Sequence, residues 1–222
     1  MTPLVKICGL STAASLEAAL KAGADMVGFV FFPKSPRNVS CETARTLGAR
    51  ARGRARIVAL SVDPADDALD AIVEWLDPDL FQLHGRESPA RVESVRSRYS
   101  RPVMKAIGVA ARADLAAAAA YETAADRLLI DAKAPADATL PGGNGRVFDW
   151  GLAADFRPVR PWFLSGGLDP INVAEAIGRT GVRGVDVSSG VESAPGIKDE
   201  LKIAAFIAAA REAFARAPEE VG

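Results

Sequence analysis

Short apolar segments alternate with helical patterns eight times along this 222-residue chain, and the alternation limits the fold more than any other feature. Each apolar segment has the length of a buried strand, and each stretch between them is long enough for a crossover connection. The predicted strands are Leu4–Cys8, Met26–Phe32, Ile57–Val62, Leu80–Leu83, Val103–Ile107, Arg127–Asp131, Trp162–Ser165 and Gly184–Val187. We therefore expect an α/β fold, a (β/α)8 barrel that forms a single domain over residues 1–222.

The competing architecture is an open doubly wound sheet, which uses the same alternation of strands and helices. Its dinucleotide-binding form needs a G-x-G-x-x-G turn directly after the first strand. Here the first strand continues into Cys8-Gly-Leu-Ser11, so that turn is absent from the sequence. The barrel is the better interpretation.

Three helices are predicted to begin with a capping side chain followed by proline at the first helical position. These pairs are Asp63-Pro64, Ser88-Pro89 and Asp169-Pro170. Ser11 or Thr12 is predicted to start the first helix, and Gly23 to end it.

Two loops rich in small residues follow the last two predicted strands, where (β/α)8 barrels commonly bind phosphate. The later loop contains Ser188, Ser189 and Gly190, whose backbone N–H groups can face an anion at the start of a short helix. The earlier loop contains Gly166 and Gly167. Each loop alone is also compatible with a tight turn, but the adjacent pair favours a phosphate site.

The longest irregular segment, 132–147, follows the sixth predicted strand at the same end of the barrel. It contains the run Pro141-Gly-Gly-Asn-Gly145. Long loops in compact domains are often functional, so a lid over the site and a plain surface insertion are both interpretations of this segment.

Two side chains at strand ends form a candidate acid–base pair. Cys8 ends the first strand and Asp131 ends the sixth. A thiolate can remove a proton and a protonated carboxyl can donate one, which is the pair that an isomerase needs. For each residue alone, the ordinary roles of a buried apolar cysteine and a loop-capping carboxylate stay open. A thiolate at neutral pH also needs a nearby cation, for which Lys6 and Arg37 are candidates by sequence position only.

Further polar residues lie at or near the strand ends. Arg37 is suited to bind a substrate carboxylate, and a surface salt bridge is its alternative role. Gln82 and His84 end the fourth strand and are candidates for substrate binding, although His84 can equally satisfy a backbone carbonyl. Lys105, inside the fifth strand, is expected to pair with a carboxylate such as Asp186.

Composition argues against several classes of function. Lys and Arg (27) nearly balance Asp and Glu (28) and aromatic residues are only 6%, so neither nucleic acid nor a membrane surface is an expected partner. Two cysteines and one histidine supply neither a disulfide framework nor a metal-ligand cluster. No apolar run approaches the ~18 residues of a membrane helix, and the N-terminal sequence lacks a signal-peptide pattern. We expect a cytoplasmic protein that binds no metal.

Taken together, these segments resemble the phosphoribosylanthranilate isomerase family of tryptophan biosynthesis over nearly the whole chain. The matching pieces are Val5-Lys-Ile-Cys-Gly9, Gly23-Ala-Asp-Met-Val-Gly-Phe-Val-Phe31, Ser35-Pro-Arg37, Gln82-Leu-His-Gly85, Leu129-Ile-Asp131, Gly142-Gly-Asn-Gly145, Phe148-Asp-Trp150, Ser165-Gly-Gly-Leu168, Val185-Asp-Val-Ser-Ser-Gly-Val-Glu192 and Pro195-Gly-Ile-Lys-Asp199. Each glycine loop is a weak signal, whereas the ordered set is highly specific. The sister barrel of histidine biosynthesis would carry aspartate where this chain has Cys8.

The resemblance implies an Amadori rearrangement of N-(5-phosphoribosyl)anthranilate that needs no cofactor. Asp131 matches the family's general acid, Cys8 matches its general base, and Arg37 resembles the ligand of the anthranilate carboxylate. The phosphate and lid elements correspond to Gly143, Gly145, Gly166, Gly167, Ser188, Ser189 and Gly190. Arg146 departs from the family pattern, which usually has lysine after the lid glycines.

Two other functions share part of this pattern. Indole-glycerol-phosphate synthase, a lyase, has similar phosphate loops but uses a lysine and glutamate constellation that has no match here. A non-catalytic barrel that binds phosphosugars would not need both Cys8 and Asp131. The expected partner is therefore a small phosphosugar–anthranilate substrate, and the sequence is compatible with either a monomer or a homodimer.

Overall fold

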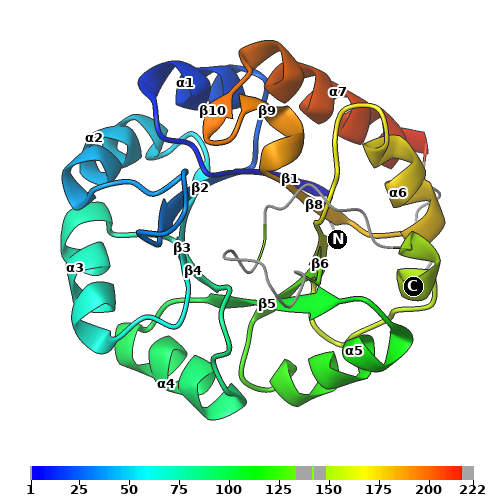
Figure 1. Ribbon diagram of the computed structural model, residues 1–222, viewed down its shortest axis with the longest axis horizontal. Helices are drawn as coiled ribbons and strands as arrows, with labels where there is room; N and C mark the ends of the chain where they lie inside the picture. The colour runs from blue at the N-terminus through cyan, green and yellow to red at the C-terminus, as the bar shows by residue number, and fades with distance from the viewer. Residues whose placement is uncertain (1, 134–141, 143–148, 217–222) are drawn as a thin grey trace.

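Eight parallel strands close into a barrel in the computed structural model, which describes residues 2–133, 142 and 149–216 (Figure 1). Each strand pairs with the next along the chain, and β1 closes the ring by pairing with β8. The strands are β1 (Leu4–Cys8), β2 (Met26–Phe31), β3 (Arg56–Ser61), β4 (Leu80–Leu83), β5 (Val103–Val109), β6 (Arg127–Ala132), β7 (Trp162–Leu164) and β8 (Gly184–Val187). The expected (β/α)8 barrel is confirmed, with small differences at the strand ends.

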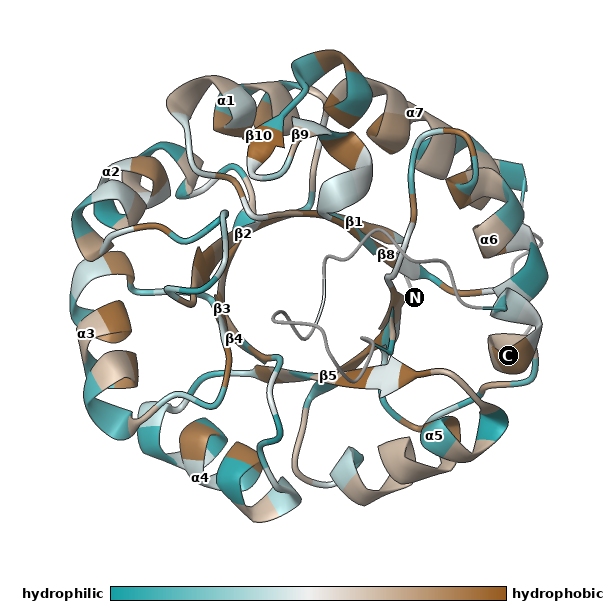
Figure 2. Cartoon of the chain, in the orientation of Figure 1, coloured by the Kyte–Doolittle hydropathy of each residue, from teal (hydrophilic) through white to brown (hydrophobic). Residues whose placement is uncertain are grey.

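Helices surround the barrel and connect successive strands (Figure 1). They are α1 (Ala13–Lys21), α2 (Cys41–Ala51), α3 (Asp66–Leu76), α4 (Pro89–Tyr99), α5 (Arg112–Ala116), α6 (Val173–Thr180), α7 (Glu200–Arg216) and the short 3-10 helices η1 (Ala117–Tyr121), η2 (Trp150–Ala153) and η3 (Ser189–Val191). A hairpin of β9 (Glu192–Ala194) and β10 (Ile197–Lys198) follows η3. Figure 2 shows apolar residues along the barrel strands and in bands on the helices.

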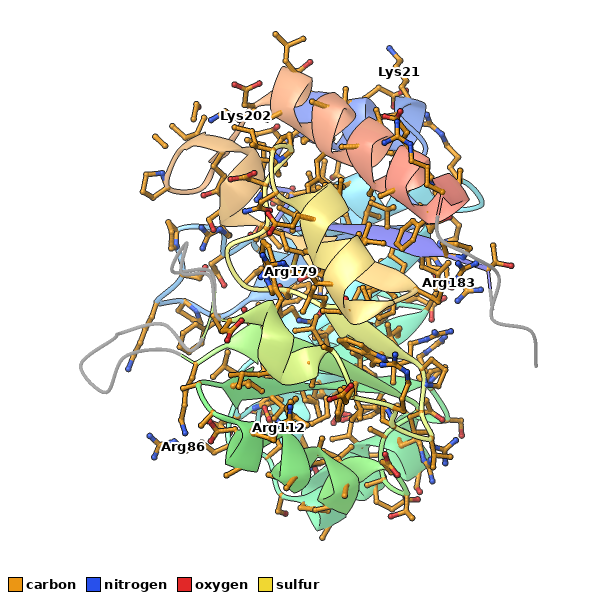
Figure 3. All side chains as sticks on the ribbon, turned by 90° about the vertical axis from the view of Figure 1, so that its right-hand side faces the viewer. Lys21, Arg86, Arg112, Arg179, Arg183 and Lys202 are labelled. Atoms are coloured by element: carbon orange, nitrogen blue, oxygen red, sulfur yellow. The ribbon has the colours of Figure 1, made fainter. Side chains whose placement is uncertain are left out.

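The outer surface carries dispersed charge. The basic side chains labelled in Figure 3 are spread over the molecule from one end of the view to the other. Among the helices that the structure describes, none is both long and apolar enough to cross a membrane.

Two of the predicted helix starts agree with the structure. Ser88 caps α4, because its side chain accepts a hydrogen bond from the backbone N–H of Arg91 at 3.2 Å, and Pro89 is the first helical residue. Thr12 caps α1 in the same way, and Gly23 follows the end of that helix with φ 89°. These starts were predictable because a cap acts on N–H groups two or three residues away.

The predicted start at Asp63-Pro64 is wrong, because α3 begins at Asp66 with Ala65 at the N-cap position. Asp63 has φ 46°, and its Oδ1 accepts a hydrogen bond from the backbone N–H of Arg86 at 2.6 Å. The side chain therefore ties the loop after β3 to the loop after β4, which is a contact between distant segments.

The start at Asp169-Pro170 is also displaced. Asp169 accepts hydrogen bonds from the backbone N–H groups of Ile171 and Asn172, and α6 begins only at Val173. Asp169 thus caps a turn that precedes the helix, and this turn lengthens the loop after β7.

The interior of the barrel changes character along its axis. Apolar residues fill one layer inside the strands: Met26, Val58, Leu80, Met104, Ala106, Leu129 and Phe163. Because side chains alternate between the two faces of a strand, positions two residues further along again point inward. Several of these inward positions are buried and polar, namely Lys6, Gln82, Asp131, Ser165 and Asp186. The polar layer lies at the end of the barrel where active sites of this fold are found.

Candidate active site

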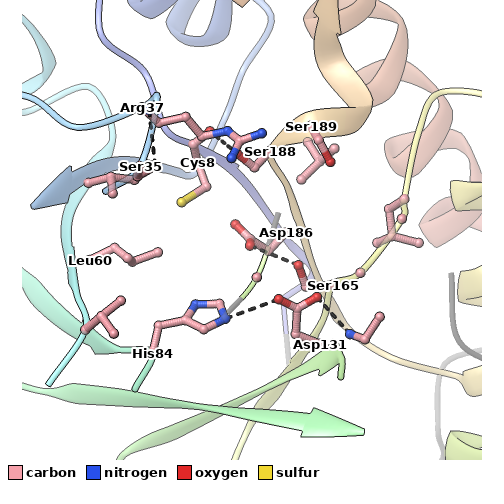
Figure 4. A pocket seen from close by; sticks show the side chains of 18 of the residues that line it. Cys8, Ser35, Arg37, Leu60, His84, Asp131, Ser165, Asp186, Ser188 and Ser189 are labelled. Carbon is pink, nitrogen blue, oxygen red and sulfur yellow. Dashed lines mark hydrogen bonds and ion pairs between the residues drawn. The ribbon is translucent and has the colours of Figure 1, made fainter. Parts of the chain in front are cut away.

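A cavity opens at the C-terminal ends of the strands, and its walls come from segments that are far apart in the sequence (Figure 4). About 790 Å³ of empty space lies between its walls, a volume that includes open solvent at its mouth. The predicted residues that line it are Cys8, Arg37, His84, Asp131, Gly166, Gly167, Ser188 and Ser189. Gln82 and Gly190 are not among the lining residues, and Gly143 and Gly145 lie outside the described residues.

Cys8 ends β1, and its sulfur faces the cavity across from Asp131 (Figure 4). Burial raises the pKa of the Cys8 thiol, the Lys6 ammonium group lowers it, and the Asp186 carboxylate raises it. The result is a pKa above the ordinary thiol value. The neutral thiol is therefore the main form of Cys8 at neutral pH, and the thiolate is a minor form.

Lys6 is the buried cation beside the thiol. Its side chain is fully buried, and Nζ donates a hydrogen bond to Oδ1 of Asp186 at 2.7 Å. Burial alone would lower the pKa of Lys6, but the negative charges of Asp186 and Cys8 raise it above its ordinary value. Lys6 is thus charged, and Asp186 balances much of its charge. This balance explains why the cation offsets only part of the effect of burial on the thiol.

Gly28 leaves space in which Lys6 and Cys8 meet. It lies in β2 opposite Cys8 in the strand register. A Cβ atom on Gly28 would lie 3.0 Å from Sγ of Cys8 and 3.2 Å from Nζ of Lys6. Any side chain at this position would therefore push against both groups.

Lys105 pairs with a carboxylate as expected, but the partner is Glu87 and not Asp186. Nζ of Lys105 donates to Oε2 of Glu87 at 2.8 Å and to the backbone carbonyl of Gly85 at 2.8 Å. Asp186 instead accepts a hydrogen bond from Lys6, which lies directly opposite it where β1 pairs with β8. Lys105 instead braces the loop that follows β4.

Asp131 is the second-to-last residue of β6 and is held by hydrogen bonds to both of its carboxyl oxygens. Oδ1 accepts the backbone N–H of Ala132 at 2.8 Å, and Oδ2 lies 3.2 Å from Nε2 of His84. The other ring nitrogen of His84, Nδ1, lies 3.1 Å from Nε2 of Gln82. The alternative in which His84 satisfies a backbone carbonyl is therefore wrong, because both ring nitrogens face side chains.

Gly142 covers this group of side chains and belongs to the long segment after β6. A Cβ atom on Gly142 would lie 2.6 Å from Oδ2 of Asp131 and 2.7 Å from Nε2 of His84. Glycine therefore allows the backbone to pass directly over the pair. The lid prediction for 132–147 falls mostly on residues 134–141 and 143–148, which lie outside the described residues.

Arg37 forms a salt bridge, as its alternative role predicted, but the side chain is 6% exposed and the salt bridge is buried and not on the surface. Its Nε and Nη2 donate to the two carboxylate oxygens of Glu192 at 2.7 and 2.8 Å. Glu192 also accepts a hydrogen bond from Nζ of Lys198 at 2.8 Å. Burial would raise the pKa of Glu192, but the hydrogen bond from Arg37 and the charge of Lys198 lower it below its ordinary value. The guanidinium group is thus fixed at the rim of the cavity (Figure 4).

Lys198 connects this ion pair to the loop after β8. Its side chain is 1% exposed, and Nζ donates to the backbone oxygen of Ser188 at 2.8 Å as well as to Glu192. Burial lowers the pKa of Lys198, although the Glu192 carboxylate acts in the opposite direction. Arg37, Glu192, Lys198 and Ser188 therefore form one connected network, in which Arg37 and Glu192 are buried and Ser188 reaches the cavity wall.

The two predicted phosphate loops lie against each other. A Cβ atom on Gly190 would overlap the carbonyl oxygen of Leu168, so the close approach of the loops requires glycine. Gly166 and Gly167 have φ values of 83° and 67°, which turn their backbone into the loop after β7. Within the described part of the chain, the N–H groups of Gly166, Gly167 and Ser189 donate to no backbone acceptor in a turn or loop. These donors are available to an anion at the cavity wall.

Several site residues had no role assigned from the sequence. Glu192 and Lys198 lie within two of the family motifs found in the sequence. An acid and a base on the two strands of one hairpin are the pattern that could have identified them. The position of Gly28 carried no signal, because its role depends on two side chains of the neighbouring strand. Within the residues that the structure describes, no group of three or more His, Cys, Asp and Glu side chains is placed to hold a metal ion.

Comparison with known proteins gives consistent matches over nearly the whole length of the chain. The model of the N-(5'-phosphoribosyl)anthranilate (PRA) isomerase family matches residues 5–209. The N-(5'-phosphoribosyl)anthranilate isomerase of Azorhizobium caulinodans is 59% identical over 211 residues, which cover 95% of this chain and 92% of that protein.

Two solved structures give the same result. A phosphoribosyl anthranilate isomerase in complex with reduced 1-(o-carboxyphenylamino)-1-deoxyribulose 5-phosphate has a TM-score of 0.83 and 34% identity, covering 96% of this chain and 100% of that one. A structure of monomers generated from the dimeric phosphoribosylanthranilate isomerase of Thermotoga maritima has a TM-score of 0.82 and 34% identity, with coverage of 96% and 100%.

Proposed function

The chain belongs to the N-(5'-phosphoribosyl)anthranilate isomerase family, and we propose that Cys8 and Asp131 perform the isomerisation as its general base and general acid. The reaction is an Amadori rearrangement, which converts N-(5-phosphoribosyl)anthranilate to 1-(2-carboxyphenylamino)-1-deoxyribulose 5-phosphate. One observation carries the assignment of roles. A thiol and a carboxyl group from opposite sides of the barrel line one cavity, and the paired glycine loops lie on its wall.

The substrate has an anionic group at each end, and the cavity offers a partner for each. We assign the phosphate to the N–H groups of Gly166, Gly167 and Ser189, where two loops of the phosphate-binding region of this fold meet. We assign the anthranilate carboxylate to Arg37, a cation held at the rim by Glu192. The ligand of the solved relative, a phosphate ester with a carboxyphenyl group, has the same two ends.

In this arrangement Asp131, on one side of the cavity, donates a proton, and Cys8, on the other side, removes one. Asp131 protonates the ring oxygen of the furanose, the bond between that oxygen and C1 breaks, and a Schiff base forms at C1. The thiolate form of Cys8 then removes the proton from C2. The resulting enolamine becomes the ketone when C1 gains a proton and the hydroxyl on C2 loses one. Every step is an acid–base step, for which one donor and one acceptor suffice.

The need for a free thiol also indicates the cellular compartment in which the protein acts. Cys8 and Cys41 are both free cysteines, and a base that acts as a thiolate is preserved in a reducing compartment. We therefore propose the cytoplasm as its location. A monomer and a homodimer are both compatible with a site built from one chain, and light scattering of the purified protein distinguishes them.

The test compares Cys8→Ala and Asp131→Asn with Cys41→Ala, a control that removes the other thiol. Loss of an acid or base typically costs about 10²-fold or more in turnover. We expect that loss in kcat for both site variants, near-normal kcat for the control, and unchanged binding of the reduced product analogue. Turnover near the wild-type rate in either site variant would refute the role assigned to that residue.

A further inference from the structure

Gln82 belongs to the polar layer inside the barrel, but both of its neighbours in the strand register are apolar. Its side chain is fully buried in β4, and its partners in the strand register are Leu60 in β3 and Met104 in β5. It is not among the residues that line the cavity. Its Nε2 lies 3.1 Å from Nδ1 of His84, whereas Oε1 is buried without a hydrogen-bond partner within the described residues. A buried carbonyl without a hydrogen-bond partner lowers stability. A function for the Nε2 contact with His84 would explain why the Gln82 amide has this orientation.

The amide nitrogen of Gln82 determines which form of His84 fits beside it. A side-chain NH2 group can only donate hydrogen bonds, so Nδ1 of His84 must accept and carries no proton. The proton of the neutral ring is then on Nε2, which faces Oδ2 of Asp131 at 3.2 Å. A charged imidazolium has an N–H group at both nitrogens, and its Nδ1–H would point at the NH2 group of Gln82.

We propose that Gln82 is a positioning residue that keeps His84 neutral, so that a proton taken up by the His84–Asp131 pair resides on Asp131. This inference rests on the proposed role of Asp131 as the general acid. Both carboxyl oxygens of Asp131 accept hydrogen bonds from protein N–H groups, one from Ala132 and one from His84. Among the described residues both oxygens therefore meet only donors, and a proton carried by this carboxyl group is available to the substrate in the cavity.

The experiment exploits the fact that His84 is the only histidine in the chain. Long-range 1H–15N correlation spectra of 15N-labelled, tag-free protein report the state of this one ring without assignment. We expect the neutral form with its proton on Nε2 in the wild-type protein at pH 7. A ring protonated on Nδ1, or an imidazolium, would overturn the proposal, and this measurement needs no variant.

Two substitutions then test the link to catalysis. In Gln82→Glu the carboxylate accepts from Nδ1–H, so we expect the imidazolium spectrum and a fall in kcat of about 10-fold or more, with KM nearly unchanged. Gln82→Met keeps the volume and removes the donor, and we expect a smaller fall in kcat. Ser61→Ala is the matched control, because Ser61 is also buried in the barrel wall and its hydroxyl has no hydrogen-bond partner in the described part of the chain.

The outcomes separate this inference from the proposed function. If Gln82→Glu changes the His84 spectrum but kcat stays within twofold of the control, the inference is wrong while the assignment of Asp131 is untouched. If Asp131→Asn is fully active, the proposed function fails whatever the state of His84. If the far-UV circular dichroism spectrum of a variant matches that of Ser61→Ala, its lower kcat does not come from misfolding.

Discussion

Replacing Glu192 by glutamine removes the charge at the centre of the network that holds Arg37. The carboxylate accepts hydrogen bonds from Nε and Nη2 of Arg37 at 2.7 and 2.8 Å and from Nζ of Lys198 at 2.8 Å. A glutamine side chain has nearly the same volume but only one accepting oxygen, so its NH2 group meets a cation. Arg37 and Lys198 then lose the carboxylate that they share.

The expected effect has two parts. Breaking a buried ion pair by removing one partner costs about 3–5 kcal/mol, which for a chain of this size corresponds to a fall in Tm of roughly 6–20 °C. The second part is weaker binding of the substrate, because Glu192 no longer orients the guanidinium group of Arg37. Loss of one hydrogen bond to a charged group costs about 1.5–3 kcal/mol, which raises KM by about 10-fold to 100-fold.

The matched control is Glu17→Gln. Glu17 makes a bidentate pair with Arg54 at 2.9 and 2.9 Å, but both side chains are on the surface, where such pairs contribute little. Calorimetry and steady-state kinetics are measured on both variants. If Glu192→Gln unfolds at the temperature of the control and keeps the wild-type KM, the network does not position Arg37.

The pH dependence of stability has a definite sign. Because the pKa of Glu192 is lowered in the folded protein, its contribution is present above the ordinary carboxyl pKa of about 4.3 and is lost as the pH falls through the lowered value. In Glu192→Gln this part of the acid destabilisation disappears. An unchanged difference in Tm between pH 6 and pH 3 would contradict this contribution.

Three further predictions follow from single contacts. Because burial raises the pKa of the Cys8 thiol despite Lys6, we expect kcat/KM to rise with pH from neutral to beyond the ordinary value of 9.0, and a plateau below pH 8 would contradict it. In Gly190→Ala the Cβ atom overlaps the carbonyl oxygen of Leu168, so we expect a loss of about 1–3 kcal/mol and a higher KM; Gly178→Ala in α6, with nothing within 4 Å, is the control. Equal KM values in the two glycine variants would show that the loops tolerate separation. Ser88→Ala removes the cap of α4 and should lower stability by about 1 kcal/mol, measured by urea unfolding, without a change in kcat.

The fold and the main candidates for chemistry could be predicted because their signals are local. Strands appear as short apolar segments, and Ser88 caps a helix through a hydrogen bond to an N–H group three residues away. Once eight strands are recognised, barrel closure alone puts Cys8 and Asp131 at the same end of the structure. No knowledge of individual contacts was needed for that step.

The partners of the charged groups were decided by tertiary structure. Lys6 and Asp186 are 180 residues apart, and Arg37 and Glu192 are 155 apart, so no spacing rule connects them. Lys6 meets Asp186 only because β1 closes against β8 in one particular register. The same closure buries Cys8, and burial outweighs the cation beside it, which is why the direction of its pKa shift could not be obtained from the order of residues.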